Sequence, residues 1–178
     1  MKKKRPRSCQ KVNLAHVPVD SADCTVVYCD GGCNPNPGPG GYGAVIIANG
    51  SLSEISGFER VTTNNRMELT AAIRSLHSIR SGKVVVYTDS RYVIDGITSW
   101  IKGWIKKGWK TRNKSPVLNR DLWEELHSHN IRLEVRWIWV KGHSGVTHNE
   151  RADALADREI RKNTGGICTG SYFKILGA

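Results

Sequence analysis

Apolar residues follow two different rhythms along the chain, and each rhythm predicts a different kind of element. Unbroken or alternating apolar residues predict strands over 25–30, 42–48, 52–58, 84–88 and 132–139. Apolar residues at three- and four-residue steps predict an amphipathic helix from Asn65 to about Arg80. Further helices are predicted from Ser90 towards Ser99, over about 119–129 and over about 148–161.

The residues between these elements are typical of turns and helix ends. Glycine and proline dominate 31–41, Asn49-Gly50 is a favoured two-residue hairpin turn, Gly82 ends the long helix, and Ser90 is a good N-cap. Three strands in succession, then helices alternating with two further strands, predict an α/β fold. We expect a mixed five-stranded sheet with helices on both faces. At 178 residues the chain is long enough for one domain with a proper core.

The charge of the chain narrows the class of partner. Lysine and arginine number 27 against 16 acidic residues, which gives a net charge of +11. Such a surface attracts polyanions, of which nucleic acid is the commonest. An anionic membrane is the competing partner, but no apolar stretch approaches the ~20 residues that span a bilayer. We therefore expect a nucleic-acid partner and no membrane.

The two ends of the chain differ in composition from its middle. Basic residues crowd the first seven positions without an apolar segment behind them, so this is not a secretory signal peptide. A nuclear address or transit peptide is the alternative to a solvated, flexible basic arm, which is the interpretation we favour. We expect this arm over 1–22, a catalytic domain over 23–162 and a loosely ordered Gly-rich tail over 163–178.

Five cysteines form an odd set without regular spacing. Cys29 and Cys33 have the look of half a zinc site, but no second Cys/His pair completes it. Reduced thiols in a cytosolic protein are the simpler interpretation.

Four carboxylates lie where an ordinary core would not put a charge. Asp30 and Asp89 each follow an apolar strand, and Glu68 and Asp153 open helical stretches. Each alone has an ordinary role: a turn former, a capping box with Asn65, a strand end, or a partner of the helix dipole. Together they are harder to explain, because like charges repel unless a cation holds them, and Mg²⁺ prefers oxygen ligands. The sequence therefore indicates a metal-dependent hydrolytic site.

A second constellation spans 100–110, Trp-Ile-Lys-Gly-Trp-Ile-Lys-Lys-Gly-Trp-Lys, which holds three tryptophans, four lysines and no acid. The four-residue spacing of its tryptophan, isoleucine and lysine pairs would give a helix with an aromatic side and a basic side. The tryptophans then anchor a projecting helix, while the lysines are either solvated or bind phosphates.

Five motifs, in order along residues 25–161, resemble type 1 ribonuclease H, the cellular bacterial form. They are Asp30-Gly31 with 34–43, Thr62–Leu69, Tyr87-Thr88-Asp89-Ser90, Trp139–His143 and Asn149–Asp153. The resemblance implies the ribonuclease H fold and an endonuclease that cuts the RNA strand of RNA/DNA hybrids, leaving 3′-hydroxyl and 5′-phosphate ends. It implies two Mg²⁺ ions, or Mn²⁺, held by Asp30, Glu68, Asp89 and Asp153. It also implies that His143 is a mobile residue that helps product leave or relays a proton.

The same resemblance suggests which residues bind the substrate. Asn36, Asn64 and Asn65 match positions that sense 2′-hydroxyls, and Thr63 and Asn119 match a pocket for a DNA phosphate. The 100–110 segment matches a basic protrusion that grips the DNA strand, through Trp100, Lys102, Lys106, Lys107 and Lys110. Gly32 and Arg91 depart from the family pattern, where Ser and Gln are common.

Two other classes of function compete with this one. A non-catalytic hybrid-binding module would keep the basic protrusion but gain nothing from carboxylates that face phosphates. A transposase- or integrase-like DNA nuclease would lack the combination of asparagine-rich loop and protrusion. We therefore expect a hybrid-specific nuclease that acts as a monomer in the cytoplasm.

Overall fold

The computed structural model describes residues 24–165. The predicted arm over 1–22, and all but the first three residues of the predicted tail, lie outside this range. Cys9 and Cys168 lie outside it as well.

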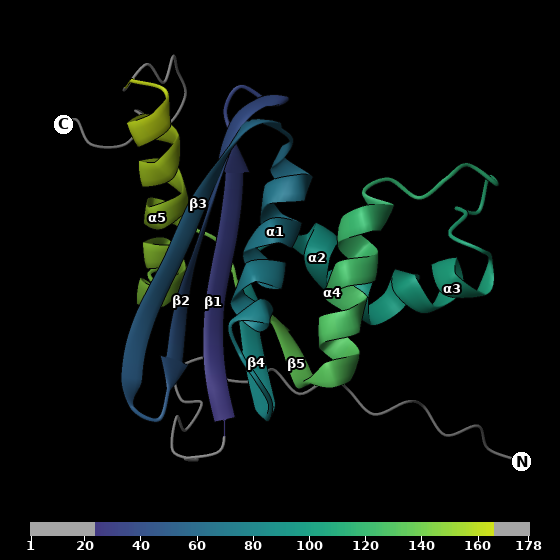
Figure 1. The fold of residues 1–178 in the computed structure, drawn as a ribbon, viewed down its shortest axis with the longest axis horizontal. Helices are drawn as coiled ribbons and strands as arrows, with labels where there is room; N and C mark the ends of the chain where they lie inside the picture. Colours follow the sequence, from purple (N-terminus) through teal and green to yellow (C-terminus); the bar gives the residue numbers. More distant parts are fainter. Residues whose placement is uncertain (1–23, 166–178) are drawn as a thin grey trace, which may run out of the picture.

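The sheet is mixed and has five strands, in the order β3-β2-β1-β4-β5 (Figure 1). β1 (Cys24–Cys33) pairs antiparallel with β2 (Gly38–Ala48), which pairs antiparallel with β3 (Ser51–Thr62). On its other side β1 pairs parallel with β4 (Lys83–Thr88), which pairs parallel with β5 (Glu134–Trp139). The predicted strand number and mixed character are confirmed.

Helices cover both faces of this sheet (Figure 1). α1 (Asn64–His77) packs on β1 and β2, and α4 (Arg120–Arg132) packs on α1. α5 (Thr147–Asn163) lies on the opposite face against β1, β2 and β3. The main core lies on the α1 side, where Val27 and Cys29 of β1 meet Leu69, Ile73 and Leu76 of α1.

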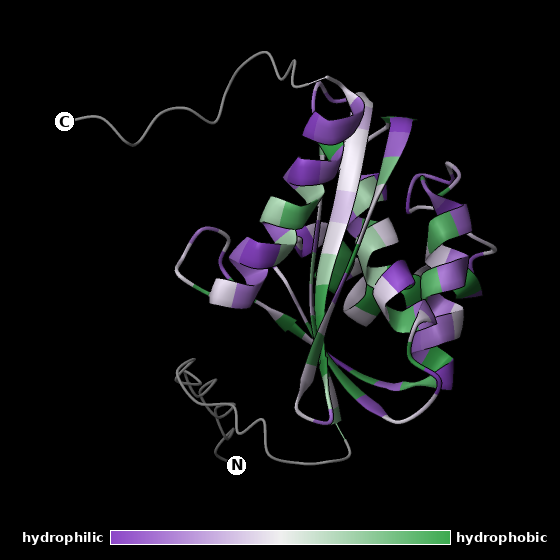
Figure 2. Cartoon of the chain, turned by 60° about the vertical axis from the view of Figure 1, so that its left-hand side comes forward, coloured by the Kyte–Doolittle hydropathy of each residue, from purple (hydrophilic) through white to green (hydrophobic). Residues whose placement is uncertain are grey.

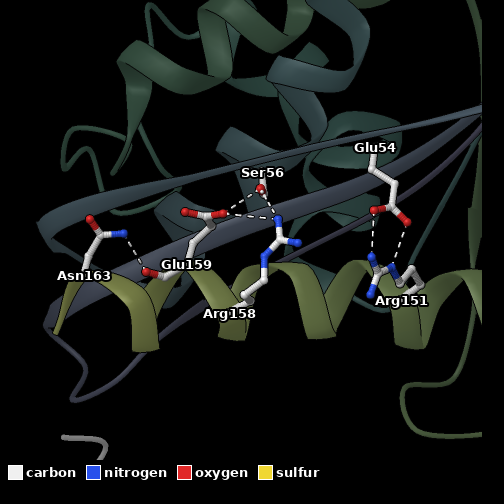
Figure 3. Close-up of polar contacts among 6 residues, drawn as sticks. All are labelled: Glu54, Ser56, Arg151, Arg158, Glu159 and Asn163. Atoms are coloured by element: carbon white, nitrogen blue, oxygen red, sulfur yellow. Dashed lines mark hydrogen bonds and ion pairs between the residues drawn. The ribbon is translucent and has the colours of Figure 1, made fainter. Parts of the chain in front are cut away.

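α5 is bound to β3 by polar contacts at two places (Figure 3). Arg151 donates to both carboxylate oxygens of Glu54, at 2.7 and 2.8 Å. About two turns further along α5, Ser56 donates to Glu159 at 2.9 Å and accepts from Arg158 at 3.2 Å. Figure 2 shows hydrophilic colour along much of α5, which agrees with a helix that presents one face to the sheet and the other to solvent.

The loop predicted over 31–41 is shorter than expected: only 34–37 lies between the strands, and the glycines on either side belong to β1 and β2. β1 continues to Cys33 and β2 begins at Gly38, with Gly32 opposite Gly41 and Cys33 opposite Gly40. Glycine favours turns, but it also lets two backbones or a strand and a helix approach closely. Asp30 therefore lies inside β1 and does not end it. The predicted turn at Asn49-Gly50 is confirmed, with positive φ at both residues.

The helix predicted to stop near Ser99 continues to Lys106. α2 (Arg91–Asp95) passes into a π-helical segment (Gly96–Trp100) and then into α3 (Ile101–Lys106). Ile97 and Ile101 are buried one turn apart, so the apolar face runs on through the expected end. Figure 1 shows α3 projecting from the body of the molecule.

Candidate active site

Asp30 on β1 lies level with Asp89, which directly follows the adjacent parallel strand β4. Tyr28 of β1 is paired with Tyr87 of β4, and each aspartate follows two residues later. Glu68 comes from the second turn of α1 and Asp153 from the second turn of α5. The expectation that Asp153 lies in the first turn of its helix is wrong, because α5 begins at Thr147.

Burial and mutual repulsion act on the carboxylates together. Burial raises the pKa of Asp30 well above its usual range, and the charges of Asp89, Asp153 and Glu68 raise it further. Burial also raises the pKa of Glu68, and Asp89 adds to the shift. The pKa of Asp153 is raised by burial and by Asp157, against a lowering by His143. The site thus concentrates negative charge that it does not neutralise itself.

Two side-chain donors hold Glu68 in place. Asn64 donates to one carboxylate oxygen at 3.0 Å, and Ser90 donates to the other at 2.6 Å. The capping-box interpretation of Asn65 and Glu68 is wrong, because Thr63 is the N-cap of α1 and accepts from the Arg66 N–H. Glu68 therefore faces the site rather than the end of its own helix.

Asp89 is surrounded by residues that arrive from β5 and α5. Trp139 donates its indole N–H to the Asp89 backbone carbonyl at 2.9 Å, and Asn149 donates to Asp89 Oδ2 at 3.2 Å. The Arg91 guanidinium lies 3.7 Å above the Trp139 ring, which is a cation–π distance. Neither Asn149 nor the Arg91–Trp139 contact was foreseen, because both depend on tertiary packing.

His143 lies beside Asp153 on the loop before α5. Its Nδ1 is 3.7 Å from Asp153 Oδ2, and its side chain is 69% exposed. The residue has a positive φ of 50°. An exposed imidazole at the mouth of the site can reach both solvent and a bound substrate.

The donor chemistry of the site fits a hard divalent cation. All four side chains are carboxylates from four different segments, and the raised pKa values of Asp30, Glu68 and Asp153 are what a cation between them would reverse. Over residues 24–165, however, no three carboxylates, histidines or cysteines are gathered closely enough to hold an ion as they stand. Hydrogen bonds from Asn64, Ser90 and Asn149 occupy several of the carboxylate oxygens instead.

The zinc alternative gains no support within the same range. Cys24, Cys29 and Cys33 are free thiols, with Cys29 buried. Cys33 donates to backbone carbonyls, including that of Pro35 at 3.1 Å.

The candidate hybrid-binding residues form two neighbouring groups. The Asn36 side chain accepts from the Asn64 N–H at 3.2 Å, so the 34–37 loop and the start of α1 meet.

In the second group, Asn119 accepts from Arg66 and donates to the Tyr92 hydroxyl. Arg66 also pairs with Asp121 at 2.8 Å. Asn65 is exposed beside Asn64. Arg66, Tyr92 and Asp121 were not predicted, although Arg66 belongs to a motif that was singled out.

The basic segment separates its side chains much as its spacing predicts. Lys102 and Lys106 are exposed on α3, with Lys107 and Lys110 exposed just beyond it. Trp104 is half-buried, with its ring centroid 5.7 Å from that of Trp100 and 5.4 Å from that of Trp123. Trp100 itself is 41% exposed.

None of the helices within residues 24–165 is both long enough and apolar enough to span a membrane.

Comparisons with known proteins agree on one family. The family model described as RNase H matches residues 22–161. A ribonuclease H of Pelobacter propionicus is 51% identical over 140 residues, covering 78% of this chain and 86% of its own. One from Chromobacterium violaceum is 54% identical, covering 78% and 95%.

Solved structures give the same result. LC9-RNase H1, described as a type 1 RNase H with the type 2 active-site motif, superposes with a TM-score of 0.69 at 31% identity, covering 88% of this chain and 78% of that one. LC11-RNase H1, solved in complex with RNA/DNA hybrid, has a TM-score of 0.60 at 26% identity, covering 79% and 99%.

Proposed function

The chain belongs to the ribonuclease H family, and from that premise we propose that it is an endonuclease that hydrolyses the RNA strand of RNA/DNA hybrids with the help of divalent metal ions. The observation that carries the proposal is the meeting of four carboxylates from β1, α1, α5 and the end of β4, with raised pKa values at Asp30, Glu68 and Asp153. A site that serves only to bind phosphates would not concentrate negative charge in this way.

Asp30, Glu68, Asp89 and Asp153 would hold two Mg²⁺ ions, and Mn²⁺ is the alternative metal. When bound, such a pair lowers the pKa of an attacking water and stabilises the leaving oxygen of an in-line displacement. The chain's own part is to place the four carboxylates around the scissile phosphate. The bond between phosphorus and O3′ would break, which leaves a 3′-hydroxyl on one product and a 5′-phosphate on the other.

His143 would assist this chemistry without holding a metal. Its imidazole is exposed beside Asp153, where it can take or give a proton at the departing end of the product. The flanking Gly142 and Gly145 support movement of this loop.

Selectivity for a hybrid requires one strand to be read as RNA and the other as DNA. Asn36, Asn64 and Asn65 would contact 2′-hydroxyls across the minor groove, since side-chain amides both donate and accept. Thr63 and Asn119 would bind a phosphate of the DNA strand, beside Arg66, whose positive charge favours that role. Trp100, Lys102, Lys106, Lys107 and Lys110 would extend the grip along the DNA strand.

We further propose that the enzyme is a cytoplasmic monomer with a catalytic domain over 23–162. The bacterial relatives with this name and the family match over 22–161 support that domain extent.

One assay tests the proposal. Labelled RNA/DNA hybrid, duplex RNA and duplex DNA are each incubated with the protein, with Mg²⁺ and with EDTA. We expect internal cleavage of the RNA strand of the hybrid alone, and only with Mg²⁺. Cleavage of duplex DNA would favour the DNA-nuclease alternative, and tight hybrid binding without cleavage would favour the binding module.

A further inference from the structure

One oxygen of Asp89 is enclosed by the chain from two sides. The Asn149 side-chain amide donates to Asp89 Oδ2 at 3.2 Å. On the loop before α5, a methyl group added at Gly142 would lie 2.5 Å from the same oxygen. A side chain at position 142 would force Oδ2 to move, so Gly142 brings bare backbone against Oδ2 while Asn149 binds it.

The orientation of the Asn149 amide is dictated by Asp89. An ionised carboxylate can only accept hydrogen bonds, so the amide NH₂ must face it and the amide oxygen must face away. That oxygen is buried and, in the part of the chain that the structure describes, has no hydrogen-bond partner. A buried, unpaired acceptor costs about 1–3 kcal/mol. The Asn149 side chain therefore keeps its hydrogen bond to Asp89 although its amide oxygen is left without a partner.

Asn149 does not cap the start of its own helix. Val146 is the N-cap residue of α5, and the N–H of Gly145 donates to Glu150 Oε1 at 2.8 Å. Asn149 is only 2% exposed, and it lies four residues before Asp153, on the same face of α5. One face of this helix thus supplies a carboxylate to the site and a neutral donor to the carboxylate beside it.

We propose that Asn149 is a positioning residue for Asp89: with Gly142 behind it, the amide holds Oδ2 and leaves Oδ1 to bind the metal ion. The proposal rests on the assignment of Asp89 as a metal ligand in the proposed function. Hydrogen-bond partners of this kind fix the orientation of a ligand, and removing one costs about 10–100-fold in metal affinity.

The test uses two variants that act on the same atom from different segments. Asn149→Ala removes the donor, and Gly142→Ala adds a methyl group against Oδ2. Metal affinity is measured without any reaction, as the Mg²⁺ concentration at the midpoint of a calorimetric binding titration. We expect that midpoint to rise about 10–100-fold in both variants. We also expect kcat at fixed, subsaturating Mg²⁺ to fall while KM for the hybrid stays within twofold.

Asn130→Ala is the matched control. Asn130 lies in α4, and its side chain accepts a hydrogen bond from the Trp137 indole at 2.8 Å. The substitution removes one asparagine hydrogen bond and should leave the Mg²⁺ midpoint unchanged. Midpoints equal to the parent's in both test variants, or an equal rise in Asn130→Ala, overturn the positioning role. Asp89→Asn separates the two proposals. If that variant keeps its Mg²⁺ response and its activity, the proposed function fails instead.

Discussion

At the scale of single residues, the carboxylates of the site carry an electrostatic cost that the rest of the fold tolerates. Asp30 is the clearest case, since burial and three neighbouring carboxylates all raise its pKa. Folding therefore favours the protonated form of Asp30. Ionised Asp30 lowers stability wherever the pH exceeds its unfolded pKa of about 4.

Asp30→Asn should abolish cleavage and raise stability in EDTA at pH 7. The folded pKa is raised, so the cost is absent below about pH 4 and grows as pH rises towards the folded pKa. Urea unfolding at pH 7 and pH 3.5 checks this, and the gain should vanish at the lower pH.

Asp121→Asn is the control of opposite sign. Arg66 lowers the pKa of Asp121, so that carboxylate stabilises the fold above pH 4 and its removal should destabilise at pH 7. A gain in the Asp121 variant, or unimpaired cleavage by the Asp30 variant, would contradict the charge assignment.

His143→Ala should slow turnover by up to about 10²-fold, the low end of what general acid–base catalysis contributes. The reason is that His143 lies outside the carboxylate set, 3.7 Å from Asp153. KM for the hybrid and the midpoint of the calorimetric Mg²⁺ titration should both stay unchanged. Loss of all activity, or a shifted midpoint, would make His143 part of the metal site.

Arg91→Gln should weaken hybrid binding and reduce the log–log salt slope by about 1 unit. The Arg91 guanidinium lies 3.7 Å from the centroid of the Trp139 ring, and Arg91 is two residues from Asp89, so its charge lies beside the site. Binding titrations between 50 and 200 mM salt measure the slope. Arg74→Gln, at an exposed position in the last turn of α1, is the control. Equal slopes in the two variants would mean that Arg91 meets no phosphate.

At the scale of elements, the basic segment separates two tasks. Its lysines are exposed on or beyond α3, whereas Trp104 packs between Trp100 and Trp123. Charge and anchoring can therefore be changed one at a time.

Replacing Lys102, Lys106, Lys107 and Lys110 with alanine should reduce the salt slope by up to about 3–4 units, because each lysine that neutralises a phosphate contributes ~0.9. Cleavage at saturating hybrid should change little, since no proposed metal ligand lies in this segment. The check is the slope of binding affinity against salt. An unchanged slope would make the segment a solvated surface.

Trp104→Ala should destabilise the fold by about 1–3 kcal/mol, below the 3–5 typical of fully buried tryptophan, because Trp104 is only half-buried. Trp100→Ala should instead cost about 1–3 kcal/mol of hybrid affinity through lost stacking, with the salt slope preserved. Urea unfolding and binding titrations of both variants distinguish these roles. If Trp100→Ala lost stability and Trp104→Ala lost hybrid affinity instead, Trp100 would be the residue that anchors the helix.

Periodicity predicted the elements better than turn chemistry predicted their ends. The three- and four-residue spacing of apolar residues from Leu69 to Leu76 predicted α1, and Asn49-Gly50 predicted the hairpin turn. Glycines 31, 40 and 41 were misread as loop, because here the absence of a side chain lets the strands pack closely against their neighbours. The Asn149–Asp89 bond joins residues 60 positions apart, and no local pattern encodes it.

At the scale of the whole molecule, sheet order explains why carboxylates far apart in sequence meet. β1 and β4 are adjacent and parallel at the centre, which brings residues 30 and 89 level. α1 and α5 then approach from opposite faces and add residues 68 and 153. The strand order could not be read from periodicity, because antiparallel and parallel neighbours of β1 share the same apolar pattern.

The position of α5 at the end of the described fold has a consequence for synthesis. This helix covers one face of β1, β2 and β3, and its backbone lies so close to β2 that a methyl group at Gly43 would collide with Ala152. The same helix carries Asp153. A nascent chain that has not yet released α5 from the ribosome therefore lacks both the cover of its sheet and its fourth carboxylate. We therefore expect a chain that stops before α5 to have no nuclease activity.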